Sequence, residues 1–93
     1  MQNNVLSVRL QHDILKALSV FHPHPPSGRQ YYNCFSDVSE LQMTANISVL
    51  IKRRLVSRLA IKKHGEDVNL RLAYLQLTQY GFDYAIRRCF TIE

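Results

Sequence analysis

The spacing of apolar residues changes in the middle of this chain from a helical period to a strand-like one, and this change restricts the possible folds most. Apolar residues first recur at every fourth position, at Ile47, Ile51 and Leu55. Such a spacing is typical of the buried face of a helix. Residues 56–63 and 69–78 instead alternate apolar and polar side chains, as half-buried strands do. A polar turn with Gly65 separates these two runs, so the sequence predicts a β-hairpin.

Apolar residues at helical spacing also occur near the start of the chain. Apolar residues fall three and four positions apart over residues 5–21, at Leu6, Leu10, Ile14, Leu18 and Phe21. We predict an amphipathic helix there, ended by the three prolines of residues 22–28. Residues 29–35 are short and aromatic, which favours a small strand. Aromatic rings beside basic residues can stack on bases, but we expect core packing for at least two of the three rings, those of Tyr31, Tyr32 and Phe35.

Three further helices are predicted from capping residues and apolar spacing. They cover residues 36–41, 44–54 and 82–90. Ser36 is a suitable cap for the first, in which Leu41 faces inward, and Thr44 caps the second. Gly81 directly precedes the third. Helices therefore precede and follow a hairpin, which predicts an α+β fold, and 93 residues suffice for one domain.

The basic residues of the chain are clustered. The formal net charge is +5, and seven of the twelve Lys and Arg residues lie between Lys52 and Arg71. The apolar positions of this stretch can face a core while the cations face outward. A folded surface with cations on a helix and the adjoining strand is what a polyanion requires, and nucleic acid is the commonest polyanion in a cell.

The order of elements and several short motifs resemble winged helix-turn-helix proteins of the MarR/PadR kind. Residues 36–41 are similar to the first helix of that family's helix-turn-helix, and residues 44–54 to its recognition helix. Leu-Val-Ser-Arg at residues 55–58 is similar to the entry into the wing, and residues 64–67 match the wing tip. Leu-Thr-Gln-Tyr-Gly at residues 77–81 is close to the family's Leu-Thr-x-x-Gly, which ends the wing.

The resemblance implies one winged helix-turn-helix domain over residues 1–93, with a three-helix core and a hairpin wing. Its parts are the helix-turn-helix at about 36–54, the wing at about 56–78 and the C-terminal helix at about 82–90. The wide apolar stripe of the first helix and the apolar residues of the last helix are a candidate homodimer interface. Packing within a single chain is the alternative role for both.

The resemblance also implies that the second helix enters the major groove of DNA while the wing contacts the backbone. Asn46 can pair with adenine and Arg53 with guanine, whereas Lys52 is expected at a phosphate. Thr44, at a helix start, can offer backbone N–H groups to another phosphate. The expected contacts on the helix are Thr44, Ala45, Asn46, Ser48, Val49, Lys52 and Arg53. The expected contacts on the wing are Arg58, Lys62, Lys63, His64 and Arg71.

Two features leave alternatives open at these positions. Glu66 and Asp67 lie in the wing turn and repel phosphate, so the tip can also point away from the duplex. The cations of the helix can form an ordinary solvated face, and Asn46 can make a local hydrogen bond to the backbone instead of contacting a base.

The predicted function is sequence-specific binding of double-stranded DNA by a small, cytoplasmic, homodimeric transcriptional regulator. The short chain favours repression by occlusion. The alternative is a winged-helix module that binds a partner protein and not DNA. We expect no enzymatic activity, because the seven carboxylates are scattered and no nucleophile constellation is visible.

No metal, cofactor or membrane contact is expected from the sequence. His22 and His24 lack a third ligand at a useful spacing, and Cys34 and Cys89 lack the paired spacing of a zinc site. The two thiols are expected to be reduced, as in most cytosolic proteins. No apolar stretch is long enough to span a bilayer, and the first residues do not form a secretion signal.

Overall fold

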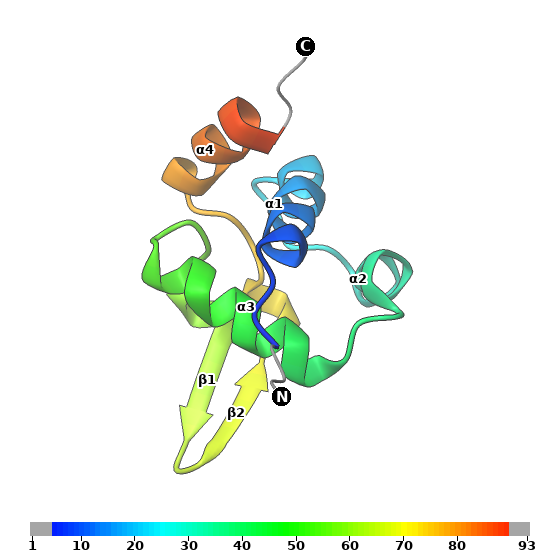
Figure 1. The fold of residues 1–93 in the computed structure, drawn as a ribbon, viewed down its shortest axis with the longest axis vertical. Helices are drawn as coiled ribbons and strands as arrows, with labels where there is room; N and C mark the ends of the chain where they lie inside the picture. The colour runs from blue at the N-terminus through cyan, green and yellow to red at the C-terminus, as the bar shows by residue number, and fades with distance from the viewer. Residues whose placement is uncertain (1–4, 90–93) are drawn as a thin grey trace.

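The computed structural model describes residues 5–89, and within them four α-helices and one two-stranded antiparallel sheet form an α+β fold (Figure 1). The helices are α1 (Val8–Phe21), α2 (Gly28–Phe35), α3 (Glu40–Lys52) and α4 (Gln79–Cys89). The strands are β1 (Ile61–His64) and β2 (Asp67–Leu70), flanked by the single-turn 3₁₀ helices η1 (Arg58–Ala60) and η2 (Leu72–Tyr74). A helix long and apolar enough to cross a membrane is absent from the described residues.

The first predicted helix is confirmed as α1. The Leu10 N–H donates a hydrogen bond to the Ser7 hydroxyl (3.1 Å), which satisfies one of the free donors at the start of the helix. The helix starts at Val8 and not at residue 5, so Leu6 lies outside it and is 52% exposed, whereas Ile14 and Leu18 of the predicted apolar stripe are fully buried. The helix ends at Phe21, where the proline segment begins, as the sequence predicts.

The predicted strand at residues 29–35 is wrong, because this segment is the helix α2. The Gln30 N–H donates to the Ser27 hydroxyl (3.2 Å), and the Ser27 N–H donates back to the Gln30 side chain (2.8 Å). This reciprocal cap outweighs the strand preference of the aromatic residues. Phe35 is buried, Tyr31 is half-buried and Tyr32 is exposed, so core packing of two of the three rings is confirmed.

The two helices predicted at residues 36–41 and 44–54 are instead the single helix α3. Ser39 and Gln42 form a second reciprocal cap at its start, with the Gln42 N–H 3.1 Å from the Ser39 hydroxyl. Thr44 is therefore not a cap; its hydroxyl lies in mid-helix and donates to the Glu40 carbonyl (3.0 Å). Residues 36–39 form the turn between α2 and α3, so the pair of successive helices lies earlier in the chain than predicted.

The predicted hairpin is present, although its regular strands are shorter than expected. The cross-strand pairs are Ile61 with Leu70, Lys62 with Asn69, Lys63 with Val68, and His64 with Asp67. Gly65 adopts a positive φ of 64° in the turn, a conformation that glycine reaches at no steric cost. An isolated bridge between Val56 and Leu77 closes the root of the hairpin, and η1 and η2 occupy the chain between this bridge and the strands.

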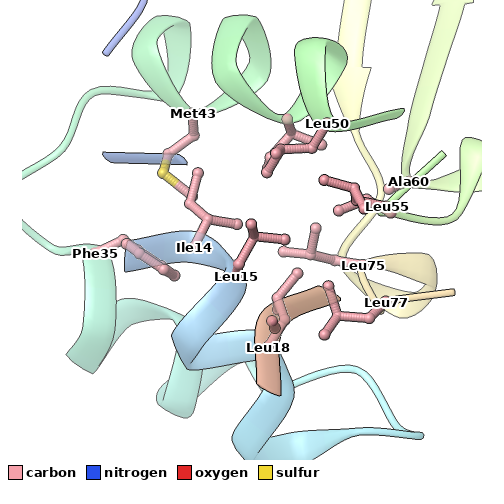
Figure 2. Packing of buried hydrophobic residues seen from close by; sticks show 13 residues of the cluster. Ile14, Leu15, Leu18, Phe35, Met43, Leu50, Leu55, Ala60, Leu75 and Leu77 are labelled. Atoms are coloured by element: carbon pink, nitrogen blue, oxygen red, sulfur yellow. The ribbon is translucent and has the colours of Figure 1, made fainter. Parts of the chain in front are cut away.

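The core lies where α1, α3 and the chain around the hairpin root meet (Figure 2). Figure 2 shows the side chains of α1 between those of α3 and those of the segment that follows the hairpin. The buried apolar residues are Ile14, Leu15, Leu18, Phe35, Met43, Ile47, Leu50, Leu55, Val56, Ala60, Leu75, Leu77 and Ala85. Because they come from all four helices, from η1 and from the chain on both sides of the hairpin, these elements share one core.

Helix α4 packs along α1 and starts earlier than the predicted residue 82. The Thr78 hydroxyl accepts from the Gly81 N–H (2.8 Å) and donates to the Arg54 carbonyl (2.7 Å). A Cβ atom on Gly81 would lie 1.8 Å from the Leu55 carbonyl oxygen, so the first turn of α4 touches the backbone that follows α3. This contact gives a physical reason for the Leu-Thr-x-x-Gly pattern at residues 77–81. Phe90, the predicted end of the helix, lies outside the described residues.

Candidate nucleic-acid interface

A shallow groove runs between the exposed side of α3 and the hairpin, and we call it the α3–hairpin groove. Its basic half encloses about 350 Å³ and is lined by Ser48, Ile51, Lys52, Arg58, Ile61 and Lys63. Its apolar half encloses about 270 Å³ and is lined by Leu41, Thr44, Ala45, Ser48, Lys63 and Val68. Ser48 and Lys63 line both halves, so the two hollows are continuous along α3.

Regular backbone periodicity brings these side chains to the groove. Leu41, Ala45, Ser48 and Lys52 follow one another at spacings of four, three and four, which places them on one stripe of α3. In the hairpin, successive side chains point to opposite faces. Lys63 and its cross-strand partner Val68 therefore face α3. Lys62 and His64 lie on the other face of the hairpin.

Three cations give the groove its charge. Lys52, Arg58 and Lys63 are all exposed, and within residues 5–89 none of them makes an ion pair or a hydrogen bond. Their charges are therefore not neutralised inside the described part of the molecule. The far end of the groove differs, because Leu41 and Val68 are 66% and 43% exposed. One half of the groove can attract an anion, and the other presents an apolar surface to a partner.

The structure brings together five of the predicted contact residues in this groove, namely Ala45, Ser48, Lys52, Arg58 and Lys63. Thr44 also lines it but is only 7% exposed, and its hydroxyl is bonded to its own helix. Val49 is half-buried and does not line the groove. Glu66 and Asp67 are exposed at the tip of the hairpin, away from α3.

The prediction that Asn46 contacts a base is wrong, because this residue is fully buried. Its side-chain oxygen accepts from the Ser7 N–H (2.8 Å) and from the Gln11 side chain (2.9 Å). Its side-chain NH₂ donates to the carbonyls of Val5 (2.8 Å) and Gln42 (2.7 Å). The amide oxygen and the NH₂ group of Asn46 thus each make two hydrogen bonds. Those to Val5 and Ser7 hold the segment before α1 against α3, and the one to Gln42 is the local backbone bond that the sequence left open.

Four other predicted contacts also point away from the groove. Arg53 turns toward α4, where its guanidinium donates to the Tyr84 hydroxyl (2.8 Å) and lies 5.1 Å from the centre of that ring. The guanidinium of Arg71 lies over the ring of Tyr74, 4.5 Å from its centre. Lys62 is on the opposite face of the hairpin, together with His64. Because Arg53 points toward Tyr84 of α4, it does not line the groove with Lys52 and cannot pair with guanine there.

Sequence reasoning missed the apolar residues of the groove. The sequence predicts that Leu41 faces inward from a separate helix at residues 36–41. Leu41 instead lies in the first turn of α3, which starts at Glu40, and there it is exposed and lines the groove. Val68 could have been assigned from the cross-strand pairing, since it lies opposite Lys63. Comparisons of the chain with protein-family models, with curated proteins and with solved structures found no match.

Proposed function

We propose that this chain is a winged-helix protein that binds double-stranded DNA, with α3 in the major groove and the hairpin as the wing. Three features support this proposal: two successive helices joined by a short turn, a third helix packed behind them, and a hairpin that follows directly. In such proteins the second of the two successive helices enters the major groove and the adjacent hairpin contacts the backbone. Here those elements are α3 and β1–β2.

The observation that carries the proposal is the set of three uncompensated cations in the α3–hairpin groove. Lys52 comes from the helix, Arg58 from η1 and Lys63 from the hairpin, so the three elements that would flank a duplex each supply one. Phosphate neutralisation by such side chains releases counterions from DNA and supplies most of the affinity of non-specific binding. Backbone contacts also fix the register of a protein on the duplex.

Base reading in this proposal falls to the stripe of α3. Leu41 and Ala45 can contact thymine methyl groups, and the Ser48 hydroxyl can bond to a base edge. None of these side chains can form the bidentate hydrogen bonds to a base edge that the sequence predicts for Asn46 and Arg53. The proposed binding therefore depends more on the DNA backbone than on sequence, with a moderate preference for A·T-containing sites.

We also propose that two copies act together and repress transcription by occlusion. Val8 and Val20 of α1 are 72% and 71% exposed, and Ile86 of α4 is 47% exposed. A second copy that covered these side chains would bury apolar surface and double the number of phosphate contacts. Sedimentation equilibrium of the protein with and without DNA tests this part, and a strict monomer in both would contradict it.

Two neighbouring lysines provide a matched test of the DNA-binding proposal. Lys63→Gln removes a cation from the groove, whereas Lys62→Gln removes the same charge from the opposite face of the hairpin. Binding to a labelled random duplex is measured by fluorescence anisotropy at several salt concentrations. For K63Q, we expect the slope of log affinity against log salt to decrease by about 0.9, the value of one lost phosphate contact. For K62Q, the slope is expected to stay at the wild-type value.

Absence of binding at low salt would contradict the proposed function, and equal effects of K62Q and K63Q would contradict the proposed geometry. A second function, binding of a partner protein through the same groove, is favoured by the exposed Leu41 and Val68. A protein complex that resists high salt, is lost in Leu41→Ser and is retained in Lys63→Gln would support that second function in place of the first.

A further inference from the structure

A second basic surface lies outside the groove, where the end of α3 meets α4. It is formed by Arg53 and Arg88, which lie over the ring of Tyr84, and by Arg54, which follows Arg53 in the chain, and we call it the α4 basic surface. Arg53 donates to the Tyr84 hydroxyl (2.8 Å) and lies 5.1 Å from the ring centre, while Arg88 lies 5.5 Å from the same centre. One tyrosine thus holds two guanidinium groups close to each other.

The donors of these arginines are largely unused. A guanidinium carries five N–H donors, and Arg53 uses one hydrogen bond, to an uncharged hydroxyl. Within residues 5–89, the Arg88 and Arg54 side chains make no hydrogen bond or ion pair, and Arg88 has its ring contact with Tyr84. Asp83 lines the adjacent hollow of about 230 Å³, but its carboxylate accepts from Gln79 (3.2 Å). Like charges held together without a paired carboxylate favour binding of an external anion.

This surface starts at the end of α3, directly after the last groove residue of that helix. Lys52, which lines the groove, is followed directly by Arg53 and Arg54. In Figure 1 the end of α3 and the loop after it lie between the hairpin and α4. Hydrogen bonds from Thr78 to Arg54 and Leu55 fix the same arrangement. The cations of the groove and those of the α4 basic surface are therefore linked along the chain at the end of α3.

We propose that the α4 basic surface binds phosphate groups of the same DNA duplex, next to those held by the groove. This inference rests on the proposed function. A phosphodiester fits because a guanidinium can donate two parallel hydrogen bonds to its oxygens, and because stacking on Tyr84 holds the guanidinium planes in place. The contact adds affinity without reading sequence.

The test compares two double variants that lose the same charge. R53Q/R88Q removes two cations of the α4 basic surface, and R9Q/R29Q removes two exposed cations of α1 and α2. Affinity for a random duplex is measured against salt, as above. For R53Q/R88Q we expect the salt slope to decrease by about 1.8 and the affinity near 0.1 M salt to fall by about fifty-fold, from two lost phosphate contacts. The R9Q/R29Q control is expected to keep the wild-type slope.

Further variants separate charge from packing. R53K/R88K keeps both charges, so its salt slope is expected to remain close to that of the wild type, even though the planar donors are lost. R54Q changes an exposed side chain that makes no hydrogen bond, ion pair or ring contact within residues 5–89, and its slope is expected to decrease by about 0.9 with an unchanged melting temperature.

Two results would overturn the inference. One is a salt slope for R53Q/R88Q equal to that of R9Q/R29Q, with K63Q still weakening binding; the proposed function would then stand without this surface. The other is energy transfer between two differently labelled duplexes that is present with the wild type and lost in R53Q/R88Q, because the surface would then hold a second duplex. Absence of DNA binding by the wild-type protein would instead overturn the proposed function itself.

Discussion

The close approach of Gly81 to the backbone of Leu55 yields the sharpest prediction about stability. Replacing Gly81 by alanine would place a Cβ atom 1.8 Å from the Leu55 carbonyl oxygen, 2.7 Å from its carbonyl carbon and 2.9 Å from its Cα. An ordinary contact between a carbon and a carbonyl oxygen is about 3.3 Å or longer. All three of these Leu55 atoms belong to the backbone, so no side chain can rotate away from the new Cβ atom. The backbone of α4 and that of Leu55 must therefore separate by roughly 1.5 Å.

The cost of Gly81→Ala follows from what this separation disturbs. Overpacking a close-packed site costs about 1–3 kcal/mol. The hydrogen bond from the Thr78 N–H to the Leu55 carbonyl (3.1 Å) would also be stretched, at about 1 kcal/mol. The better helix propensity of alanine returns up to about 1 kcal/mol. We therefore expect the free energy of unfolding to decrease by about 3 kcal/mol.

Thermal denaturation followed by circular dichroism measures this change. For a chain of 93 residues the entropy of unfolding is about 0.2 kcal/mol per degree, so a loss of about 3 kcal/mol lowers the Tm by roughly 15 °C. Gly28→Ala is the matched control, because a Cβ atom at this position in α2 would meet nothing closer than the Leu72 side chain at 4.0 Å. Its Tm is expected to equal or slightly exceed that of the wild type. A G81A protein that melts at the same temperature as G28A would refute the reasoning.

Three further changes test other contacts. Asn46→Ala leaves buried donors and acceptors without partners and is expected to lower the free energy of unfolding by about 2–4 kcal/mol in urea denaturation; a loss below about 1 kcal/mol would contradict the network. Arg54 has a left-handed φ of 66°, so Arg54→Gly is expected to raise the Tm by about 5 °C, and a lower Tm would contradict this account of strain. Burial raises the pKa of the Cys89 thiol whereas Cys34 is exposed, so alkylation near pH 8 followed by mass spectrometry should label Cys34 first; equal rates would be inconsistent with the structure.

The sequence predicted the larger elements because each rests on a repeated pattern. The helix α1 contains four of the five apolar residues at helical spacing, and the hairpin has two alternating runs around Gly65. Errors arose where two local signals competed. At α2 the Ser27–Gln30 cap outweighs the strand preference of Tyr31 and Tyr32. The same type of cap, Ser-x-x-Gln, also marks the true start of α3 at Ser39.

The site was only partly predictable, because the orientation of a helix depends on residues far away in the chain. Lys52 and Lys63 could be assigned to an exposed basic side from their spacing. The role of Asn46 could not, since two of its partners, Val5 and Ser7, lie about forty residues earlier and reveal nothing about it by themselves. From the sequence alone, a polar residue on a helix with both apolar and polar residues fits a buried hydrogen-bond network as well as it fits a base contact.

The network around Asn46 also determines how the protein should be handled. It fixes Val5 beside α3. An affinity tag or fluorescent domain joined before Met1 is therefore tethered next to the helix that would face a duplex, where its bulk would block access. Figure 1 shows the end of α4 on the far side of the molecule from the hairpin. A label attached after that helix leaves the groove open but lies next to Arg88 of the α4 basic surface, so binding assays should use the untagged protein and a labelled duplex.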